Sequence, residues 1–263
     1  MAAAASAPLV ELKIDGHVAV ITLANPERRN VLDLPMARAL RGAAEHAGAA
    51  ADVRCVVITG TGNAFAAGAD IAELEAASAE DNLAYNAQLL EAVDAVAAIP
   101  VPTIAAVNGH AVGGGLELAC ACVLRVVSTK AKLGLPEARL GILPATGGLA
   151  RLPRLIPPTL AARLLLTGDL IDGTEAAALG LANSAVETDQ VLPEALALAG
   201  RIASAAPLSA RAIVDSLRSD GGLPIAEANR RVEERLAGVL ASADRREGAR
   251  AFLERRDPVF KGS

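Results

Sequence analysis

The first part of the chain contains two short stretches in which apolar and polar side chains alternate. Residues 9–14 and 17–23 follow this two-residue period and are rich in β-branched side chains. Such alternation is typical of strands that bury one face. The dipeptide Asp15-Gly16 between them suits a tight turn, because both residue types tolerate a positive φ. We therefore predict a β-hairpin over residues 9–23.

Short apolar runs and longer amphipathic stretches alternate from residue 33 to residue 128. The apolar runs predict buried strands at residues 53–59, 102–107 and 123–128. The amphipathic stretches predict helices at residues 34–47, where Asp33 is the N-cap, and at 71–77, 81–98 and 114–122. Strands that alternate with helices usually pair in parallel through right-handed crossovers. The sequence thus predicts an α/β fold.

The pattern changes after Asp172. Apart from a short apolar run at residues 182–186, the remaining sequence has helical periodicity. Helices are predicted at residues 173–179, 193–204, 207–219, 224–241 and 244–254. We expect an α/β core over residues 1–190 and a helical C-terminal region over residues 191–263.

Composition excludes several functional classes. The chain has 263 residues, of which 52% are hydrophobic and 2% aromatic, so the core is expected to be aliphatic. The formal net charge of −5 provides no general attraction for nucleic acid. The start of the chain lacks the basic segment of a signal peptide, and no apolar stretch reaches the ~18 residues of a membrane span. We expect a soluble protein that binds neither nucleic acid nor membranes.

The three cysteines and three histidines indicate neither a disulfide framework nor a metal site. An odd number of cysteines fits a reducing compartment, and we expect the protein in the cytoplasm. Cys120 and Cys122 are interpreted as small core residues. His17, His46 and His110 lack the spacing of metal ligands, so we expect no metal.

A loop of small residues follows the first buried strand. Residues 60–65 approach the glycine pattern of a dinucleotide-binding loop, but Phe65 occupies the third glycine position and no helix begins there. We therefore reject a dinucleotide site. The next residues, Ala67, Gly68 and Ala69, have small side chains that would let a ligand approach the backbone amides. A tight loop packed beneath a helix is the alternative explanation.

Three consecutive glycines, Gly113, Gly114 and Gly115, stand at the start of the helix predicted at residues 114–122. Free amides at a helix N-terminus attract a negative oxygen, and the helix macrodipole adds to this attraction. No Lys-Ser or Lys-Thr pair follows, so the loop is not a nucleotide-binding P-loop. The glycines form either an oxyanion hole, whose donors are each worth ~10²–10³ in rate, or a site of close helix–strand packing.

Two glutamates are candidates for acid–base chemistry. Glu117 lies in the first turn of the same helix, between Leu116 and Leu118, where the apolar sequence predicts burial. A buried acid is costly unless it has a task, although a first-turn acid also compensates the helix dipole. Glu137 follows Pro136 at a predicted turn, where a surface acid would be ordinary. Beside an oxyanion hole, the two carboxylates could hold a water molecule and transfer protons.

These candidates lie within motifs that occur together. The motifs are AFAAGADI (64–71), IAAVNGHAVGGGLEL (104–118), PE (136–137), GILP (141–144), GG (147–148), LTGD (166–169) and the segment 246–252. Jointly they resemble the crotonase (enoyl-CoA hydratase/isomerase) superfamily, over essentially the whole chain. The resemblance implies a crotonase-like spiral of ββα units and a helical trimerisation region, assembled as a homotrimer or a dimer of trimers.

The resemblance also implies roles for single residues. It implies that the Ala69 and Gly114 amides bind the oxygen of an acyl-CoA thioester and stabilise an enolate. Glu117 would orient or deprotonate water, and Glu137 would deliver a proton to the α carbon. The substrate-binding residues implied in the same way are Arg28, Ala67, Gly68, Asp70 and Gly113. No separate cofactor is implied, since coenzyme A is part of the substrate.

Two glutamates at these positions imply, within the superfamily, hydration of a trans-2-enoyl-CoA. We therefore expect an enoyl-CoA hydratase that serves β-oxidation or a related acyl-CoA pathway. Other reactions of the fold, isomerisation or thioester hydrolysis, are the first alternative. A non-catalytic acyl-CoA-binding protein is the second.

The sequence departs from the usual hydratase pattern at several positions. Ala72 stands where many hydratases carry a lysine near the CoA phosphates, and Val123 stands where many carry an aspartate. Residues 149–150 are Leu-Ala in place of the frequent Thr-Gln. These departures concern CoA affinity and acyl preference. Arg28 and Arg29, in the loop that matches the CoA-binding segment, are either phosphate contacts or solvated surface charges.

Overall fold

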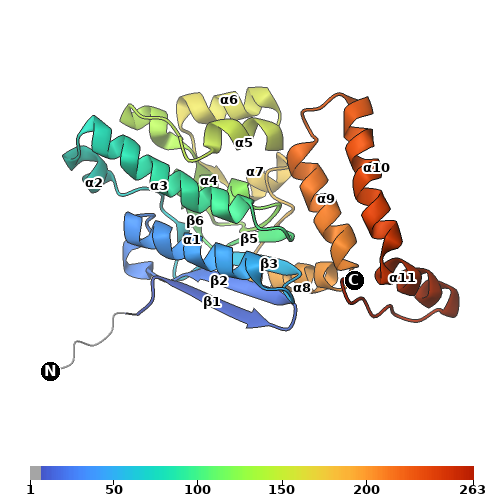
Figure 1. Cartoon of the computed structure of the whole chain (residues 1–263). Coiled ribbons are helices and arrows are strands. Elements are labelled where there is room, and N and C mark those ends of the chain that lie inside the picture. Colours follow the sequence, from blue (N-terminus) through green and yellow to red (C-terminus); the bar gives the residue numbers. More distant parts are fainter. Residues whose placement is uncertain (1–6) are drawn as a thin grey trace.

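The computed structural model describes residues 7–263, which form two β-sheets covered by helices (Figure 1). The large sheet contains, in spatial order, β1 (Val10–Asp15), β2 (Val18–Leu23), β3 (Cys55–Gly60), β5 (Thr103–Val107), β7 (Leu124–Ser128) and β10 (Ser184–Val186). The small sheet contains β4 (Ala64–Ala66), β6 (His110–Val112), β8 (Lys132–Gly134) and β9 (Ile171–Asp172). The predicted hairpin is confirmed, because β1 and β2 pair antiparallel from Asp15 opposite Val18 outward.

The two sheets arise from a repeated strand–strand–helix unit. In the units that begin with β3, β5 and β7, the first strand joins the large sheet and the second joins the small sheet, whereas β1 and β2 both lie in the large sheet. Strands of successive units pair in parallel in both sheets. The helices that follow are α1 (Leu34–Ala49), α2 (Ile71–Ala76), α3 (Ala79–Ala97) and α4 (Gly114–Ala121). The chain therefore advances as a spiral, and equivalent loops of neighbouring units lie next to each other.

Helices cover both faces of the large sheet. The side chains of β3 alternate between the two faces, as the period of a strand requires. Cys55 and Val57 pack in one cluster with α8 (Val191–Ala203), whereas Val56 and Ile58 belong to the larger cluster that contains residues of α1 and α3. Because both faces are buried, the strand sequence is continuously apolar rather than alternating.

The remaining helices follow β8 along the chain. They are α5 (Gly148–Leu155), α6 (Pro158–Thr167), α7 (Gly173–Ala178), α9 (Pro207–Ser219), α10 (Ile225–Ala241) and α11 (Ala243–Glu254). The first two were not predicted as helices. The pair α9 and α10 stands away from the layered core, at the right of Figure 1, with α11 below it. Among residues 7–263 no single helix is both long and apolar enough to cross a membrane. Residues 188–203, which include α8, and α9 together have sufficient length and apolar composition, but the two helices are bent by 113° relative to each other.

Several predicted boundaries were wrong. The segments between the predicted strands and helices, at residues 60–70 and 108–113, contain β4 and β6, which are too short to show a period. The strand predicted at 53–59 is β3, which begins two residues later. The helix predicted from residue 81 begins at Ala79, because the Ser78 side chain accepts a hydrogen bond from the Asp81 amide (3.1 Å) and caps it. The helix predicted from residue 193 begins at Val191. Pro193 fits in its first turn, because amide hydrogens there have no acceptor within the helix.

Candidate active site

Two loops meet where β4 and β6 of the small sheet end. The first loop leads from β4 to α2 and contains Gly68, and the second contains Gly113 and enters α4. Both glycines have a positive φ, 86° and 56° respectively, which disfavours any side chain. A β-carbon at Gly68 would lie 3.2 Å from the Gly114 nitrogen, and one at Gly114 would lie 3.9 Å from the Ala69 nitrogen. The absence of side chains thus lets the two predicted amide donors approach each other.

The amides of Ala69 and Gly114 are available as donors. Gly114 is the first residue of α4, so its amide has no acceptor within the helix. Within residues 7–263, neither amide donates to a backbone carbonyl outside the regular elements. The Gly113 carbonyl instead accepts from Leu116 (2.8 Å) and Glu117 (3.0 Å). The two free N–H groups can therefore bind one oxygen atom of a ligand.

Asn30 holds the first loop in place, a role that sequence analysis missed. Its side chain is fully buried, and its amide nitrogen donates to the carbonyls of Thr61 (3.0 Å), Ala64 (2.9 Å) and Phe65 (3.2 Å). Asn30 has a φ of 53°, which asparagine tolerates better than most residues. Its position in a polar loop was the only available signal, and that signal is weak.

Arg28 lies beside the first loop and pairs with two carboxylates. Its guanidinium forms ion pairs with Asp33 (2.6 Å) and with Asp70, while its side chain stays about half exposed. An open cleft of about 370 Å³ is lined by Glu27, Arg28, Arg29, Val31, Ala67, Ala69, Asp70 and Ile71. Four of the predicted site residues, Arg28 among them, therefore share one surface with Arg29. The two aspartates offset the charge of Arg28, so Arg29 is the arginine in this cleft without such an ion pair among the described residues.

Glu117 is buried in the first turn of α4 and is held by two donors. Its side chain is 2% exposed. The Gly148 amide donates to its Oε1 (2.7 Å), and the Thr146 hydroxyl donates to its Oε2. Burial raises the pKa of Glu117, whereas these hydrogen bonds and the nearby Arg151 charge act in the opposite direction. Sequence analysis did not predict that Thr146 and Gly148 donate to Glu117. The Gly147-Gly148 motif was noted, but no role was assigned to it.

Glu137 is also buried, but its carboxylate is not held by hydrogen bonds at both oxygens. It lies in a short 3₁₀ helix, η2 (Pro136–Leu140), and is 8% exposed. A β-carbon at Gly113 would lie 2.8 Å from its Oε1, so this carboxylate faces the second loop directly. Its Oε2 has no hydrogen-bond partner among the described residues. Burial, and then the charge of Glu117, raises the pKa of Glu137 to about 7.

The structure therefore gathers the predicted site residues around the two loops. Gly68, Ala69, Gly113 and Gly114 form the backbone part, and the carboxylate of Glu137 faces it. Glu117 is close enough for its charge to act on Glu137. Arg28, Ala67 and Asp70 lie on the adjoining cleft. Two free amides beside one anchored and one unpaired carboxylate can bind a polar oxygen and move protons at neighbouring atoms. Among residues 7–263 no group of three or more His, Cys, Asp or Glu residues could hold a metal ion.

Comparison with known proteins shows the family of the chain. Residues 13–263 match the family described as enoyl-CoA hydratase/isomerase. The chain belongs to the enoyl-CoA hydratase/isomerase family. It is 42% identical, over 248 residues, to a putative enoyl-CoA hydratase of Thermus thermophilus, covering 93% of this chain and 98% of that protein. It is 36% identical, over 251 residues, to a crotonyl-CoA hydratase of Syntrophomonas wolfei, covering 95% and 96% of the two chains.

Solved structures of the enoyl-CoA hydratase/isomerase family share the fold. The crystal structure of an enoyl-CoA hydratase from Bacillus anthracis superposes with a TM-score of 0.94, at 33% identity, and covers 97% of this chain and 100% of that one. This likeness confirms the predicted crotonase-like α/β fold. It also confirms the resemblance on which the predicted roles of the site residues depend.

Proposed function

We propose that this protein is an enoyl-CoA hydratase, which adds water to a trans-2-enoyl-CoA and forms a 3-hydroxyacyl-CoA. The observation that carries the proposal is the pair of buried carboxylates beside two free amides. Glu117 is anchored by two donors, and Glu137 has an unpaired oxygen and a pKa raised to about 7. An acid–base reaction needs such a pair of groups with different proton affinities.

In the proposed mechanism, the Ala69 and Gly114 amides donate hydrogen bonds to the thioester oxygen, which becomes negative as the enolate forms. Donors placed where charge develops are each worth ~10²–10³ in rate. Glu117 orients a water molecule and takes its proton while the water oxygen bonds to the β carbon. Glu137 then gives its proton to the α carbon. Transfer of the water proton from Glu117 to Glu137 restores both groups, so that one water molecule is added in total.

The raised pKa of Glu137 supports its assignment as the proton donor. A carboxylic acid with an ordinary pKa would be ionised at neutral pH and could not donate. At a pKa of about 7 a large fraction stays protonated near neutrality. A purely binding protein would gain nothing from two buried acids, because each costs desolvation energy.

The direct test is turnover of crotonyl-CoA by the purified protein. We expect 3-hydroxybutyryl-CoA as the product, with Glu117→Gln and Glu137→Gln each lowering kcat by roughly 10²–10⁴, the range for loss of a general acid or base. Glu187→Gln, which removes an exposed carboxylate paired with Lys130, is the control and should retain wild-type turnover. Faster CoA release or faster 3-enoyl conversion than hydration would instead identify a thioester hydrolase or an isomerase. Wild-type turnover in either active-site variant would contradict the role given to that residue.

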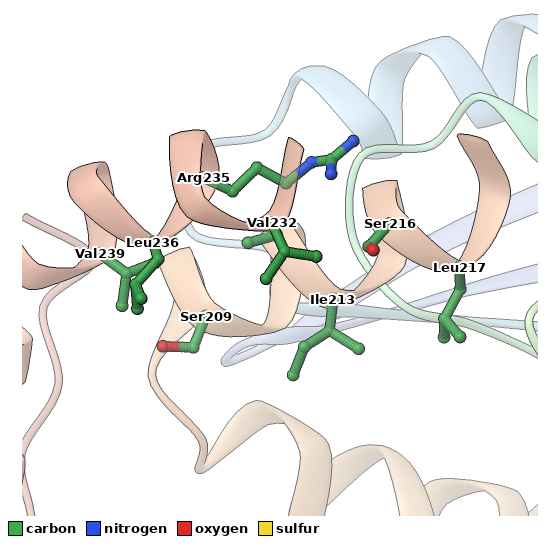
Figure 2. Close-up of a pocket in the computed structure, with 9 residues that line it drawn as sticks. Ser209, Ile213, Ser216, Leu217, Val232, Arg235, Leu236 and Val239 are labelled. Atoms are coloured by element: carbon green, nitrogen blue, oxygen red, sulfur yellow. The ribbon is translucent and has the colours of Figure 1, made fainter. Parts of the chain in front are cut away.

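We also propose that the protein assembles as a homotrimer or a dimer of trimers through the helices that leave the core. A groove of about 360 Å³ lies between α9 and α10, and Figure 2 shows Ile213 and Leu217 on one side and Val232, Leu236 and Val239 on the other. Exposed apolar patches of this kind mark protein interfaces. The occupant proposed for this surface is a second copy of the chain.

A further inference from the structure

Thr146 lies in the loop between η2 and α5, directly before the Gly147-Gly148 motif. Its side chain is almost fully buried, and its hydroxyl donates to Oε2 of Glu117. The Thr146 carbonyl accepts from Arg151 Nη1 (3.2 Å), and Arg151 also pairs with Asp94 of α3. The Thr146 carbonyl is thus held by Arg151 of the following helix, α5, and Arg151 is itself paired with α3.

The carboxylate of Glu117 is held at both oxygens by one short segment. Thr146 binds Oε2, and two residues later the Gly148 amide binds Oε1 (2.7 Å). A carboxylate held at both oxygens cannot rotate about its last side-chain bond without losing a hydrogen bond. Nothing comparable restrains Glu137, whose Oε2 has no partner within residues 7–263.

We propose that Thr146 is a positioning residue, whose hydroxyl fixes the Glu117 carboxylate in the orientation in which it takes the proton of the attacking water. The role in turnover rests on the proposed function, whereas the anchoring of Glu117 does not. Thr146 touches no reacting atom and acts only through Glu117. A hydrogen bond from a hydroxyl to a carboxylate is a charge-assisted bond, which is stronger than one between neutral groups.

The groups around Glu117 determine what loss of the hydroxyl would do. Arg151 of α5 stabilises the charged form of Glu117, while Glu137 of η2 opposes it, and Cys120 on the same helix stays neutral because burial raises the pKa of its thiol to about 11. Asp94 on α3 pairs with Arg151 and offsets part of its charge. Without the Thr146 hydroxyl, burial of Glu117 would be less compensated, so the pKa of Glu117 would rise further.

The test compares Thr146→Val, Thr146→Ser and Thr59→Val. The first removes the hydroxyl and keeps the shape, the second keeps the hydroxyl, and the third removes a buried threonine hydroxyl that bonds the Ala106 carbonyl (3.0 Å) instead. We expect Thr146→Val to lower kcat by roughly 10- to 100-fold with little change in KM, as loss of a hydrogen bond to a charged group implies. The acidic limb of its pH–rate profile should move to higher pH. Thr146→Ser should restore most of kcat, and Thr59→Val should behave like wild type.

A second measurement needs no turnover. Infrared spectroscopy of the free protein can follow the ionisation of the Glu117 carboxyl, whose band is assigned by its loss in Glu117→Gln. Thr146→Val should titrate at higher pH than wild type, and Thr146→Ser should not. If Thr146→Val does not fold, Thr146→Ala replaces it in both measurements.

The outcomes separate the two proposals. An unchanged kcat together with an unchanged Glu117 titration in Thr146→Val overturns the positioning role, and so does a loss of kcat that serine does not restore. If the wild type hydrates no enoyl-CoA, the proposed function fails. The infrared titration then still decides whether Thr146 anchors Glu117.

Discussion

At the scale of single residues, the two candidate glutamates differ in how their charges are compensated. Both are buried, yet Glu117 accepts hydrogen bonds at each oxygen, and Glu137 leaves one oxygen without a partner. Burial raises the pKa of each, and for Glu137 the value reaches about 7. The ionised form of Glu137 is buried with too few hydrogen bonds, so ionisation of this group lowers the free energy of unfolding.

The substitution Glu137→Gln should therefore stabilise the protein while it lowers turnover. The folded state binds the Glu137 proton more tightly than the unfolded state, so the wild type loses stability as pH rises from about 4.5 to about 7. Each tenfold change in proton affinity is worth about 1.4 kcal/mol, so the loss amounts to at most about 3.5 kcal/mol. Glutamine carries no charge and avoids this loss. Urea unfolding at pH 5 and pH 8, at one fixed protein concentration, should show the stability gain of the variant mainly at pH 8.

Glu247 provides a control of opposite sign. Its hydrogen bonds with Arg256 lower the pKa of Glu247 to about 2. The folded state then prefers the ionised form, which stabilises the protein above the unfolded pKa and is lost as pH falls. Glu247→Gln should therefore destabilise the protein at pH 8. Equal gains from Glu137→Gln at pH 5 and pH 8 would contradict the proposed penalty.

Some of the site residues could be predicted from the sequence, whereas others could not. Glu117 was conspicuous because an acid stood within an apolar helix start, and the motifs around it raised the other site residues as a group. Thr146 and Asn30 gave no such signal, because their partners lie far along the chain. Thr146 is 29 residues from Glu117, and Asn30 is 34 residues from Ala64. A polar residue in a loop shows its role only when the fold brings its partner close.

At the scale of elements, the site depends on pieces too short to show a period. The strands β4, β6 and β8 have three residues each, yet they place Gly68, Gly113 and η2 side by side. The long buried strands and amphipathic helices were predictable, because their periods extend over several residues. The small sheet was not, since its pairing depends on contacts between successive repeats.

The 3₁₀ helix η2 carries Glu137 and is held from outside the site. Arg139 donates to the Thr167 carbonyl and pairs with Asp169 (2.7 Å), which fastens η2 to the end of α6. We expect Arg139→Met to lower kcat by about tenfold, because small misplacements of a catalytic group are costly. The free energy of unfolding should change by less than about 1 kcal/mol, as is usual for exposed ion pairs.

Arg163 on α6 provides the matched control for Arg139. It forms an exposed ion pair with Glu175 (2.8 Å) that has no connection to η2. Steady-state kinetics and urea unfolding of Arg163→Met should both match the wild type. An Arg139→Met variant with wild-type kcat would show that η2 is held without this contact.

At the scale of the whole molecule, the helices after residue 190 have two different tasks. The first, α8, completes the core, because it packs against β3, β5 and β7 of the large sheet. The last three helices, α9, α10 and α11, and the residues after them contact the core through a few hydrogen bonds. Arg218 of α9 donates to the Ile99 carbonyl (2.6 Å), and Arg54 donates to the carbonyl of Phe260 (2.8 Å). Contacts this sparse leave the apolar side chains of α9 and α10 largely uncovered.

The double variant Ile213→Lys/Leu236→Lys should dissociate the proposed assembly. Both side chains border the groove between α9 and α10, and they are 59% and 46% exposed. Two buried lysines without partners would each cost several kcal/mol at an interface, whereas on a monomer surface they would be nearly neutral. Sedimentation velocity should show three or six chains for the wild type and one for the variant. Ile14→Lys, which alters a side chain of similar exposure (42%) on β1, should leave the assembly intact. A wild type that sediments as a single chain, or a variant that keeps its partners, would rule out this surface as the interface.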